Sequence, residues 1–294
     1  MPKGIILKGV GGTYTVFCNG DNYDCKPRGL FRKLGVTPLP GDDVLFDTGK
    51  ENEGYITEIL PRDNVLIRPA VANVDIMVIV VALSSPEPDF LLVDKISTAC
   101  FIQSIEPVIC ANKSDGTKDE YMTKIINNYR PTGIKTFFTS ALNNTGIDEM
   151  VAYFTQKTVV FAGQSGTGKS TLINTIIGKE VMETGKISVK IERGKHTTRH
   201  TNFILTKDGA FIADTPGFSN IEPHDIDEKE LQYYYPEFDR YMGRCKYQGC
   251  IHINEPDCKI KQAVEDGLIG AGRYENYIRI YNRLIENNKQ KRGY

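Results

Sequence analysis

Short runs of alternating hydrophobic and polar residues fill the first 68 positions of the chain. Runs such as Thr13–Cys18 and Tyr55–Leu60 have the period of two that is typical of half-buried strands. Turn signals, among them Asn19-Gly20-Asp21, separate these runs. Several short strands at this spacing predict a small β-barrel, which we interpret as an OB-type barrel. An SH3-like barrel is the alternative.

From about residue 70 to residue 218, apolar strands alternate with helical stretches. Asp75–Leu83, Pro107–Ala111 and Thr158–Ala162 are strand-like, whereas Asp89–Ile105 and Ser170–Ile177 have a helical pattern. This order is typical of an α/β domain with a parallel sheet. The remainder is mostly helical and polar, and a group of Cys and His residues interrupts it. The pattern therefore predicts three domains, at residues 1–68, 69–219 and 220–294.

Composition excludes several classes of protein. With 40% hydrophobic and 25% charged residues, the chain is neither disordered nor collagenous. The net charge is -1, so any contact with RNA or DNA would need a local basic patch. The longest apolar run, Val74–Leu83, is about half of a membrane span. We expect a cytoplasmic protein without a membrane contact, and because no sequence feature favours an oligomer we expect a monomer.

Residues 163–170, Gly-Gln-Ser-Gly-Thr-Gly-Lys-Ser, match the P-loop pattern G-x-x-x-x-G-K-[ST] between an apolar strand and a helix. Glycines let backbone N–H groups surround phosphates, and the helix N-terminus favours their negative charge. Lys169 can reach the β and γ phosphates, and the Ser170 hydroxyl can bind Mg²⁺. In the later stretch DTPG, Asp214 can hold Mg²⁺ and the Gly217 N–H can contact the γ-phosphate. The sequence therefore predicts nucleotide binding with Mg²⁺.

The stretch NKSD, residues 112–115, follows another predicted strand. The Asp115 carboxylate can accept two hydrogen bonds from the N1–H and N2–H₂ edge of guanine, a donor pair that adenine lacks. Asn112 can tie this loop to the P-loop, and the stem of Lys113 can cover the base. After the next strand, the small residues Ser140 and Ala141 allow a backbone N–H to reach the guanine O6. An ATPase or kinase, with NKSD a coincidental loop, is the alternative.

The candidate GTP-binding residues are Asn112, Lys113, Ser114, Asp115, Ser140, Ala141, Gly163, Gln164, Ser165, Gly166, Thr167, Gly168, Lys169, Ser170, Thr171, Asp214 and Gly217.

Together these elements resemble the motif set of GTPases, called G1 to G5, but in the chain order G4-G5-G1-G2-G3. This order is a circular permutation, which a single sheet permits because the loops need only meet at one edge. A barrel, a permuted GTPase and a Cys/His cluster in succession are similar to the RsgA family of small ribosomal subunit biogenesis GTPases, over essentially all 294 residues.

The resemblance implies a GTP hydrolase that acts in late maturation of the 30S subunit. It would bind GTP or GDP and 16S rRNA, and use hydrolysis to drive its own release or that of an assembly factor. The alternative is a nucleotide-gated RNA-binding module whose hydrolysis is incidental. That alternative gains support from Phe218, which follows Gly217 where Ras-like enzymes have the Gln that orients water.

Switch I, the G2 element, should lie within residues 181–201, where Gly194–Thr198 resembles the motif of the family. The resemblance implies that a switch I histidine replaces the missing Gln, which here is His196, with His200 as the second candidate. A threonine would complete the Mg²⁺ shell only with GTP bound. We favour Thr198 over Thr197. The candidate catalytic residues are therefore His196, Lys169 and Thr198, and the candidate Mg²⁺ ligands are Ser170, Asp214 and Thr198.

Near the C-terminus, Cys245, Cys250, His252 and Cys258 follow the spacing C-x4-C-x-H-x5-C. Three thiolates and one imidazole suit tetrahedral Zn²⁺, and four protein ligands leave no open position for a substrate. We therefore predict one structural zinc ion in a mostly α-helical domain, and the resemblance points to the same four residues. Loose thiols in a loop are the alternative.

The ligand of the barrel is less well defined by the sequence. Its one local basic patch consists of Lys26, Arg28, Arg32 and Lys33, with Tyr23 and Phe31 available for stacking on bases. RNA is the partner that the resemblance implies, while a protein or single-stranded DNA is the alternative. A second basic stretch, Gly272–Tyr294, includes Arg273.

Overall fold

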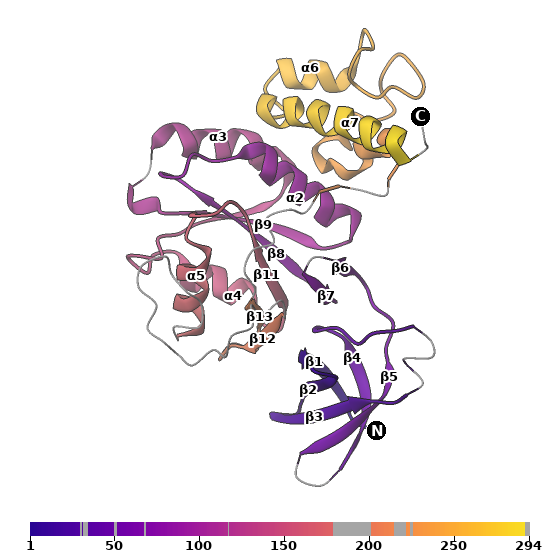
Figure 1. Ribbon diagram of the computed structural model, residues 1–294. Helices are drawn as coiled ribbons and strands as arrows, with labels where there is room; N and C mark the ends of the chain where they lie inside the picture. Colours follow the sequence, from indigo (N-terminus) through magenta and orange to yellow (C-terminus); the bar gives the residue numbers. More distant parts are fainter. Residues whose placement is uncertain are drawn as a thin grey trace.

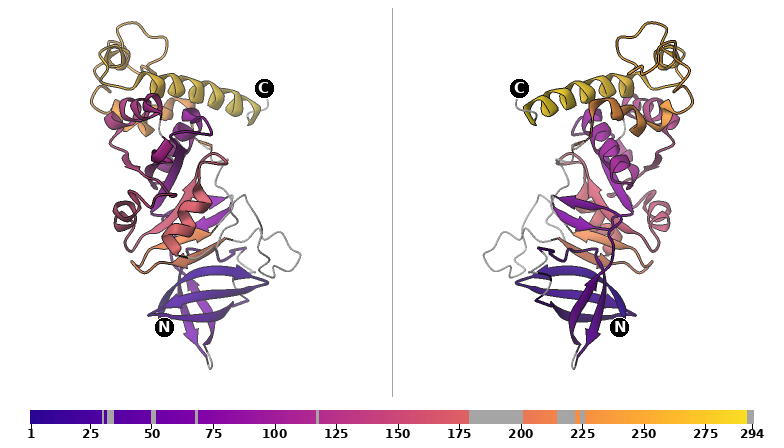
Figure 2. Two further views of the ribbon diagram at one scale, coloured as in Figure 1. Left: turned by 90° about the vertical axis from the view of Figure 1, so that its left-hand side faces the viewer. Right: turned by 90° about the vertical axis from the view of Figure 1, so that its right-hand side faces the viewer.

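The structure is a computed structural model of the chain. It describes residues 1–294 with the exception of 30, 32–34, 50–51, 68, 117, 179–200, 215–221, 224–225 and 292–294. Three parts lie in a row, with a β-barrel at one end, an α/β domain in the middle and a helical part at the other end (Figures 1 and 2). Within the described residues, no helix is long and apolar enough to cross a membrane.

The N-terminal part is a closed barrel of five strands. They are β1 (Lys3–Val10), β2 (Thr13–Cys18), β3 (Asp21–Pro27), β4 (Asp43–Thr48) and β5 (Glu53–Ile59). Their order is β1-β2-β3-β5-β4, and β4 pairs back with β1, which closes the barrel; β3 and β5 run parallel. A five-stranded barrel with this order is the OB fold, so the OB-type prediction is confirmed. Apolar side chains such as Ile6, Val16 and Phe46 fill its interior.

Phe31 is also part of the barrel interior, where it is 8% exposed. The prediction that Phe31 is available for stacking on bases is therefore wrong, because its ring is used to fill the core. Tyr23 is partly buried against Phe46, with ring centroids 5.1 Å apart. The exposed aromatic side chain of the barrel is Tyr55 instead, which lies beside Lys26 on the neighbouring strand.

A short hairpin and one strand contact connect the barrel to the α/β domain. The hairpin consists of β6 (Val65–Ile67) and β7 (Ala70–Ala72), so the predicted domain limit at 68/69 falls at its turn. The side chain of Asn64 accepts from the N–H of Val74 and donates to its carbonyl, both at 2.9 Å, which fixes the entry into the next strand. Lys8 of β1 pairs with Asn202, so both sheets form one continuous ladder.

The α/β domain has a six-stranded sheet with the order β10-β9-β8-β11-β13-β12. The strands are β8 (Ile76–Ala82), β9 (Glu106–Asn112), β10 (Lys135–Phe138), β11 (Thr158–Ala162), β12 (Asn202–Leu205) and β13 (Phe211–Asp214). All neighbours run parallel except β12, which forms an antiparallel hairpin with β13. The carboxyl ends of the five parallel strands therefore meet at one edge.

Helices cover both faces of this sheet. On one face, α2 (Phe90–Ile102) and α3 (Asp119–Tyr129) share a core with β8 and β9. On the other face, α4 (Ile147–Tyr153) and α5 (Lys169–Ile177) pack on the opposite side chains of the same strands. Because β8 is buried on both faces, its sequence is continuously apolar rather than alternating. Short 3-10 turns, η1 (Ser114–Gly116) and η2 (Arg130–Thr132), flank α3.

The C-terminal part is helical, as predicted. It contains the 3-10 elements η3 (Glu228–Tyr234) and η4 (Pro236–Phe238), then α6 (Lys259–Glu265) and the long helix α7 (Ala271–Lys291). Its core is aromatic, and Tyr277 contacts the rings of Tyr235 and Phe238 at centroid distances of 5.0 Å. Helix α7 lies across α2 and α3 of the α/β domain (Figure 1).

A buried ion network joins α7 to the α/β domain. Arg273 is completely buried, and its guanidinium binds Asp94 of α2 at 2.7 Å and Glu237 of η4 at 2.5 Å. Tyr129 and Asn276 donate hydrogen bonds to the same Asp94 carboxylate, at 2.8 and 2.6 Å. Although burial lowers the pKa of Arg273, the two carboxylates outweigh this effect and hold the guanidinium charged.

Candidate nucleotide site and candidate metal centre

The P-loop lies at the carboxyl end of β11, the strand at the centre of the sheet. Gly163, Gly166 and Gly168 all have positive φ angles, so the chain curls back before α5 begins at Lys169. The Lys169 ammonium donates to the carbonyls of Gly163 at 2.8 Å and Gln164 at 2.7 Å, inside the curl. Partial burial lowers the pKa of Lys169. The free N–H groups of the first turn of α5 and the Lys169 side chain both belong to this end of the helix, an arrangement that suits phosphates.

The loop after β9 is tied to the P-loop by two side chains. Asn112 Nδ2 donates to the Thr167 carbonyl at 2.9 Å, and Lys113 Nζ donates to the Gly166 carbonyl at 2.7 Å and to the Ser85 carbonyl. The approach is so close that a Cβ on Gly168 would lie 2.4 Å from Asn112 Nδ2. The NKSD stretch and the P-loop, which are about fifty residues apart in sequence, therefore form one structural unit.

The loop after β10 completes this unit. Asn112 Oδ1 accepts from the Ala141 N–H and from the Thr139 hydroxyl, both at 3.2 Å. The Ser140 hydroxyl donates to Asp115 Oδ1 at 2.5 Å, which fixes the carboxylate at the edge of the loop. Thr139 and Ser85 help to hold the predicted residues in place, Thr139 through its hydroxyl on Asn112 and Ser85 through its carbonyl on Lys113. The sequence gives no signal for Ser85, because a backbone carbonyl contact does not depend on residue type.

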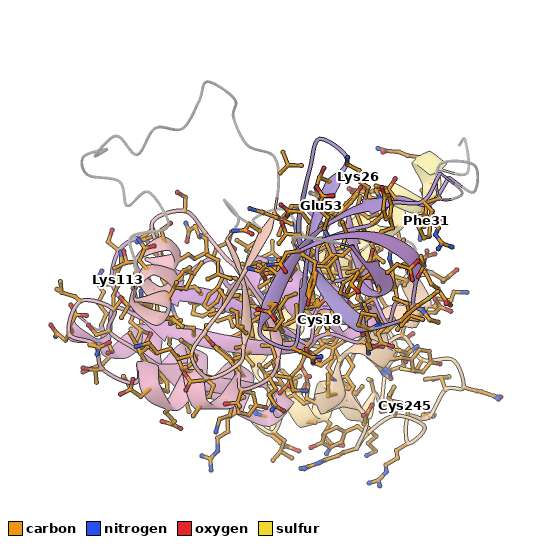
Figure 3. The ribbon with its side chains drawn as sticks, turned by 90° about the horizontal axis from the view of Figure 1, so that it is seen from below. Cys18, Lys26, Phe31, Glu53, Lys113 and Cys245 are labelled. Atoms are coloured by element: carbon orange, nitrogen blue, oxygen red, sulfur yellow. The ribbon has the colours of Figure 1, made fainter. Side chains whose placement is uncertain are left out.

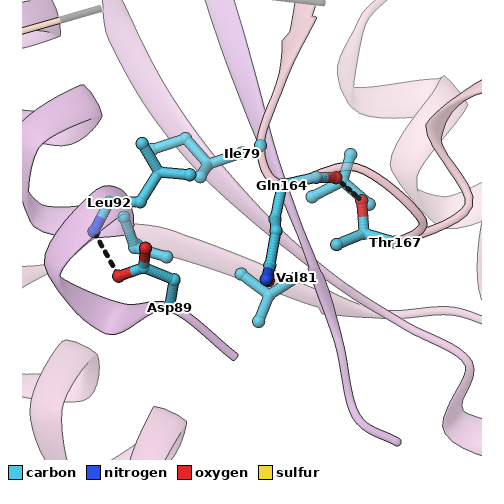
Figure 4. A pocket seen from close by; sticks show the side chains of 9 residues that line it. Ile79, Val81, Asp89, Leu92, Gln164 and Thr167 are labelled. Atoms are coloured by element: carbon cyan, nitrogen blue, oxygen red, sulfur yellow. Dashed lines mark hydrogen bonds between the residues drawn. The ribbon is translucent and has the colours of Figure 1, made fainter. Parts of the chain in front are cut away.

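Behind the P-loop there is a small cavity between β8, the start of α2 and Gln164 (Figure 4). Thr167 Oγ1 donates to the Gln164 carbonyl at 3.0 Å, and Asp89 accepts from the Leu92 N–H at 2.9 Å as the N-cap of α2. With a volume of about 10 Å³, the cavity has room for about one water molecule. Gln164 Oε1 is buried there without a partner among the described residues. This cavity therefore belongs to the packing of the P-loop rather than to a ligand site.

The remaining candidates for the nucleotide site divide into those that lie within the described residues and those that lie outside them. Ser165 lies on the P-loop, Ser170 and Thr171 lie in the first turn of α5, and Ser114 lies in η1 after β9. Asp214 ends β13, which is paired directly with β11, so both carboxyl ends are neighbours at the same edge of the sheet. Outside the described residues lie His196, Thr198 and Gly217, as do Thr197, His200 and Phe218.

The second site is the Cys/His cluster, where the ligand atoms of Cys245, Cys250, His252 and Cys258 all lie within 4.8 Å of one another. Cys245 Sγ lies 3.8 Å from Cys258 Sγ, and His252 Nδ1 lies 3.6 Å and 3.3 Å from these two sulfurs. Burial lowers the pKa of His252, so its imidazole stays neutral as a metal ligand must. Three soft sulfurs and one imidazole around a common centre can hold a metal ion.

The fold and these loops define a P-loop protein of the GTPase class, in which the two base-recognition loops precede the P-loop in the chain. Residues 59–224 match the family model for the RsgA GTPase, and residues 3–56 match that for the RsgA N-terminal domain. The chain belongs to the RsgA GTPase family.

Curated relatives match over nearly the whole length. A protein of Ruminiclostridium cellulolyticum, named small ribosomal subunit biogenesis GTPase RsgA, is 47% identical over 97% of this chain and 94% of its own. A protein of the same name from Bacillus subtilis is 40% identical over 97% of this chain and 98% of its own.

Two solved structures have the same architecture. YjeQ from Thermotoga maritima superimposes with a TM-score of 0.83 at 31% identity, over 97% of this chain and 98% of its own. YloQ, described as a circularly permuted GTPase, also has a TM-score of 0.83, at 34% identity, over 98% of this chain and 96% of its own. The permuted fold predicted from the motif order is therefore confirmed.

Proposed function

We propose that this protein hydrolyses GTP during late maturation of the 30S ribosomal subunit, as a cytoplasmic monomer that binds 16S rRNA. The observation that carries the proposal is the joining of three loops, after β9, β10 and β11, into one hydrogen-bonded unit at a single edge of the sheet. Family membership and the names of the relatives supply the ribosomal part. Hydrolysis would drive release of the protein itself or of an assembly factor from the subunit.

In the proposed reaction, the P-loop N–H groups and Lys169 bind the β and γ phosphates. Ser170 and Asp214 would hold Mg²⁺, with Thr198 as the ligand from switch I. When bound, this ion neutralises charge that develops on the phosphate oxygens. His196 would orient the attacking water, because an apolar residue, Phe218, stands where Ras-like enzymes have glutamine. The Gly217 N–H would contact the γ-phosphate.

Guanine selectivity is proposed to reside in Asp115. Ser140 donates to one of its oxygens, which leaves the carboxylate oriented by the protein before a base arrives. A guanine edge would offer two donors to this carboxylate, whereas an adenine edge would leave it unpaired. Lys113, which is held over the P-loop by the Gly166 and Ser85 carbonyls, would cover one face of the base.

We propose zinc as the metal of the Cys/His cluster. With Zn–S bonds of about 2.3 Å and tetrahedral angles, two sulfur ligands lie about 3.8 Å apart. The separation of Cys245 Sγ and Cys258 Sγ has this value, 3.8 Å. All four ligands come from the protein, so the role is structural. The ion would hold the loop 245–258 against the aromatic core of the C-terminal part.

The barrel is the proposed RNA-binding part. Figure 3 shows Lys26 and Glu53 on its outer surface, and the exposed ring of Tyr55 follows Glu53 by two positions. An exposed aromatic beside a lysine is suited to stacking on a base and binding a phosphate. Arg28 is paired with Asp47 at 2.8 Å, so this charge is partly neutralised. The proposal therefore rests on Lys26 and Tyr55 rather than on the stacking residues expected from the sequence.

The test is steady-state hydrolysis of GTP and of ATP by the purified protein, with and without 30S subunits. We expect the protein to hydrolyse GTP but not ATP, and its GTP turnover to rise at least about tenfold when 30S subunits are added, as for a GTPase whose catalytic site a partner completes. Turnover that ignores saturating 30S subunits would favour the nucleotide-gated binding module instead. Equal affinity of 30S subunits for the GDP form and for a form with a non-hydrolysable GTP analogue would refute release by hydrolysis.

A further inference from the structure

His252 has a contact outside the metal cluster. Its Nδ1 faces the sulfurs of Cys245 and Cys258, while its Nε2 lies 2.9 Å from Oε1 of Gln232. Gln232 comes from η3, twenty residues earlier in the chain, and is 9% exposed. The imidazole is therefore held between the cluster on one side and a buried amide on the other.

Hydrogen bonding determines which imidazole nitrogen carries the proton. The amide nitrogen of Gln232 donates to the Lys229 carbonyl at 2.9 Å, and this carbonyl can only accept, so the amide oxygen must face His252. An amide oxygen can only accept as well. The proton therefore resides on Nε2 of His252, and Nδ1 presents its lone pair to the cluster.

We propose that Gln232 is a positioning residue of the metal site, which selects the His252 tautomer that binds a metal through Nδ1. This inference rests on the proposed zinc site. It adds a residue that the spacing of the Cys and His residues does not contain. Outer partners of this kind orient the ligand and raise its basicity.

The position of η3 gives the contact a second consequence. Asp227 and Glu230 form a capping box that starts η3, and the element contacts both α7 and α2. The metal loop is otherwise attached to α7, through hydrogen bonds from Tyr274 and Tyr277 to the carbonyls of His252 and Ile251. Gln232 is therefore a link between the metal loop and the segment that arrives from the α/β domain.

The experiment compares three variants of the full-length protein in competition titrations of Zn²⁺ with a chromophoric chelator. Gln232→Leu removes the acceptor and should weaken Zn²⁺ binding about 10- to 100-fold. Gln232→Glu keeps an acceptor in place and should retain an affinity within about threefold of the parent, since carboxylates are common partners of metal-bound histidines. Tyr233→Ala, at the exposed neighbouring position, is the matched control and should leave the affinity unchanged.

A second readout does not depend on the variants folding. In the zinc-loaded parent protein, ¹⁵N NMR of the histidine side chains should show His252 metal-bound at Nδ1 and protonated at Nε2. Coordination through Nε2, or an unchanged Zn²⁺ affinity in Gln232→Leu, would overturn the role of Gln232. A parent protein that binds no zinc at one equivalent would instead remove the proposed zinc site itself, so the two failures are distinguishable.

Discussion

Loss of the Arg273 charge should destabilise the protein more than any other single substitution in the C-terminal helix. Arg273→Met keeps a long apolar side chain between Tyr129 and Tyr235, whose ring centroids lie 5.7 and 4.5 Å from the guanidinium carbon. It leaves the carboxylates of Asp94 and Glu237 buried without a cation. Breaking a buried ion pair in this way costs about 3–5 kcal/mol in the free energy of unfolding.

The two carboxylates contribute unequally to this cost. Asp94 keeps two donors, from Tyr129 and Asn276, whereas Glu237 already has one oxygen without a partner among the described residues. Most of the penalty should therefore arise at Glu237. The triple variant Arg273→Met, Asp94→Asn, Glu237→Gln removes all three charges and should recover much of the loss, because the uncompensated charge is the costly element.

Urea unfolding followed by far-ultraviolet circular dichroism measures the effect, since the chain has no tryptophan for fluorescence. With a slope of about 3 kcal/mol per M of urea, a loss of about 3–5 kcal/mol in Arg273→Met should lower the midpoint of the unfolding transition by about 1–1.7 M. Arg279→Met, on an exposed position of the same helix, is the control and should shift it little. A loss below about 1 kcal/mol, or a triple variant no more stable than the single one, would refute the reasoning.

Four further predictions concern the nucleotide site, the metal site and the contact of Glu222 with α2 and α7. Asp115→Asn should weaken GTP binding at least about 100-fold and improve binding of xanthosine triphosphate, measured against the exposed control Asp119→Asn. Gly168→Ala should reduce nucleotide affinity at least about tenfold in the same assay, because its φ is +93° and the new Cβ would meet Asn112. Zinc removal by a strong chelator should accelerate amide hydrogen exchange in residues 245–258 but not in β8. Burial raises and two cations lower the pKa of Glu222, with a net value below its usual 4.5. Its stabilisation is therefore present above pH 4.5 and lost as the pH falls further, so Glu222→Gln should differ from the parent in thermal stability at neutral pH only.

The sheet of the α/β domain was predictable because its signals are local. The apolar run of β8 and the Gly-rich stretch before α5 have few other interpretations, and both are found close to the expected bounds. Strand β3, Asp21–Pro27, has a weak signal in the sequence, because only one of its residues, Cys25, is fully buried and its pattern does not alternate clearly. The parallel pairing of β3 with β5 depends on barrel closure, a property of the whole chain that no window of residues contains.

Residue type alone does not show the burial or the contacts of several side chains. Arg273 belongs to a basic stretch of the sequence, and the structure buries it completely between two carboxylates. Phe31 lies among basic residues, a setting that suggests a stacking residue, although it fills the barrel core. Gln232 had no signal, because its importance comes from a histidine that only the fold brings near. Such pairings depend on tertiary contacts between distant segments.

The permuted order has a mechanical consequence, because the chain leaves the sheet after Asp214 and enters the helical part. Glu222 is the first charged anchor among the described residues after β13, with ion pairs to Lys95 of α2 at 2.8 Å and Arg283 of α7 at 3.2 Å. These groups are partly exposed, so each pair is worth about 1 kcal/mol or less. The other ion pair that joins the C-terminal part to α2 is that of Arg273 with Asp94, which is buried and costs several times more to break. A displacement of the chain after β13 would therefore break the ion pairs of Glu222 at a much lower cost in free energy than it would separate α7 from α2. We accordingly expect α2 and the C-terminal part to move as one body, with Glu222 as the contact that yields first.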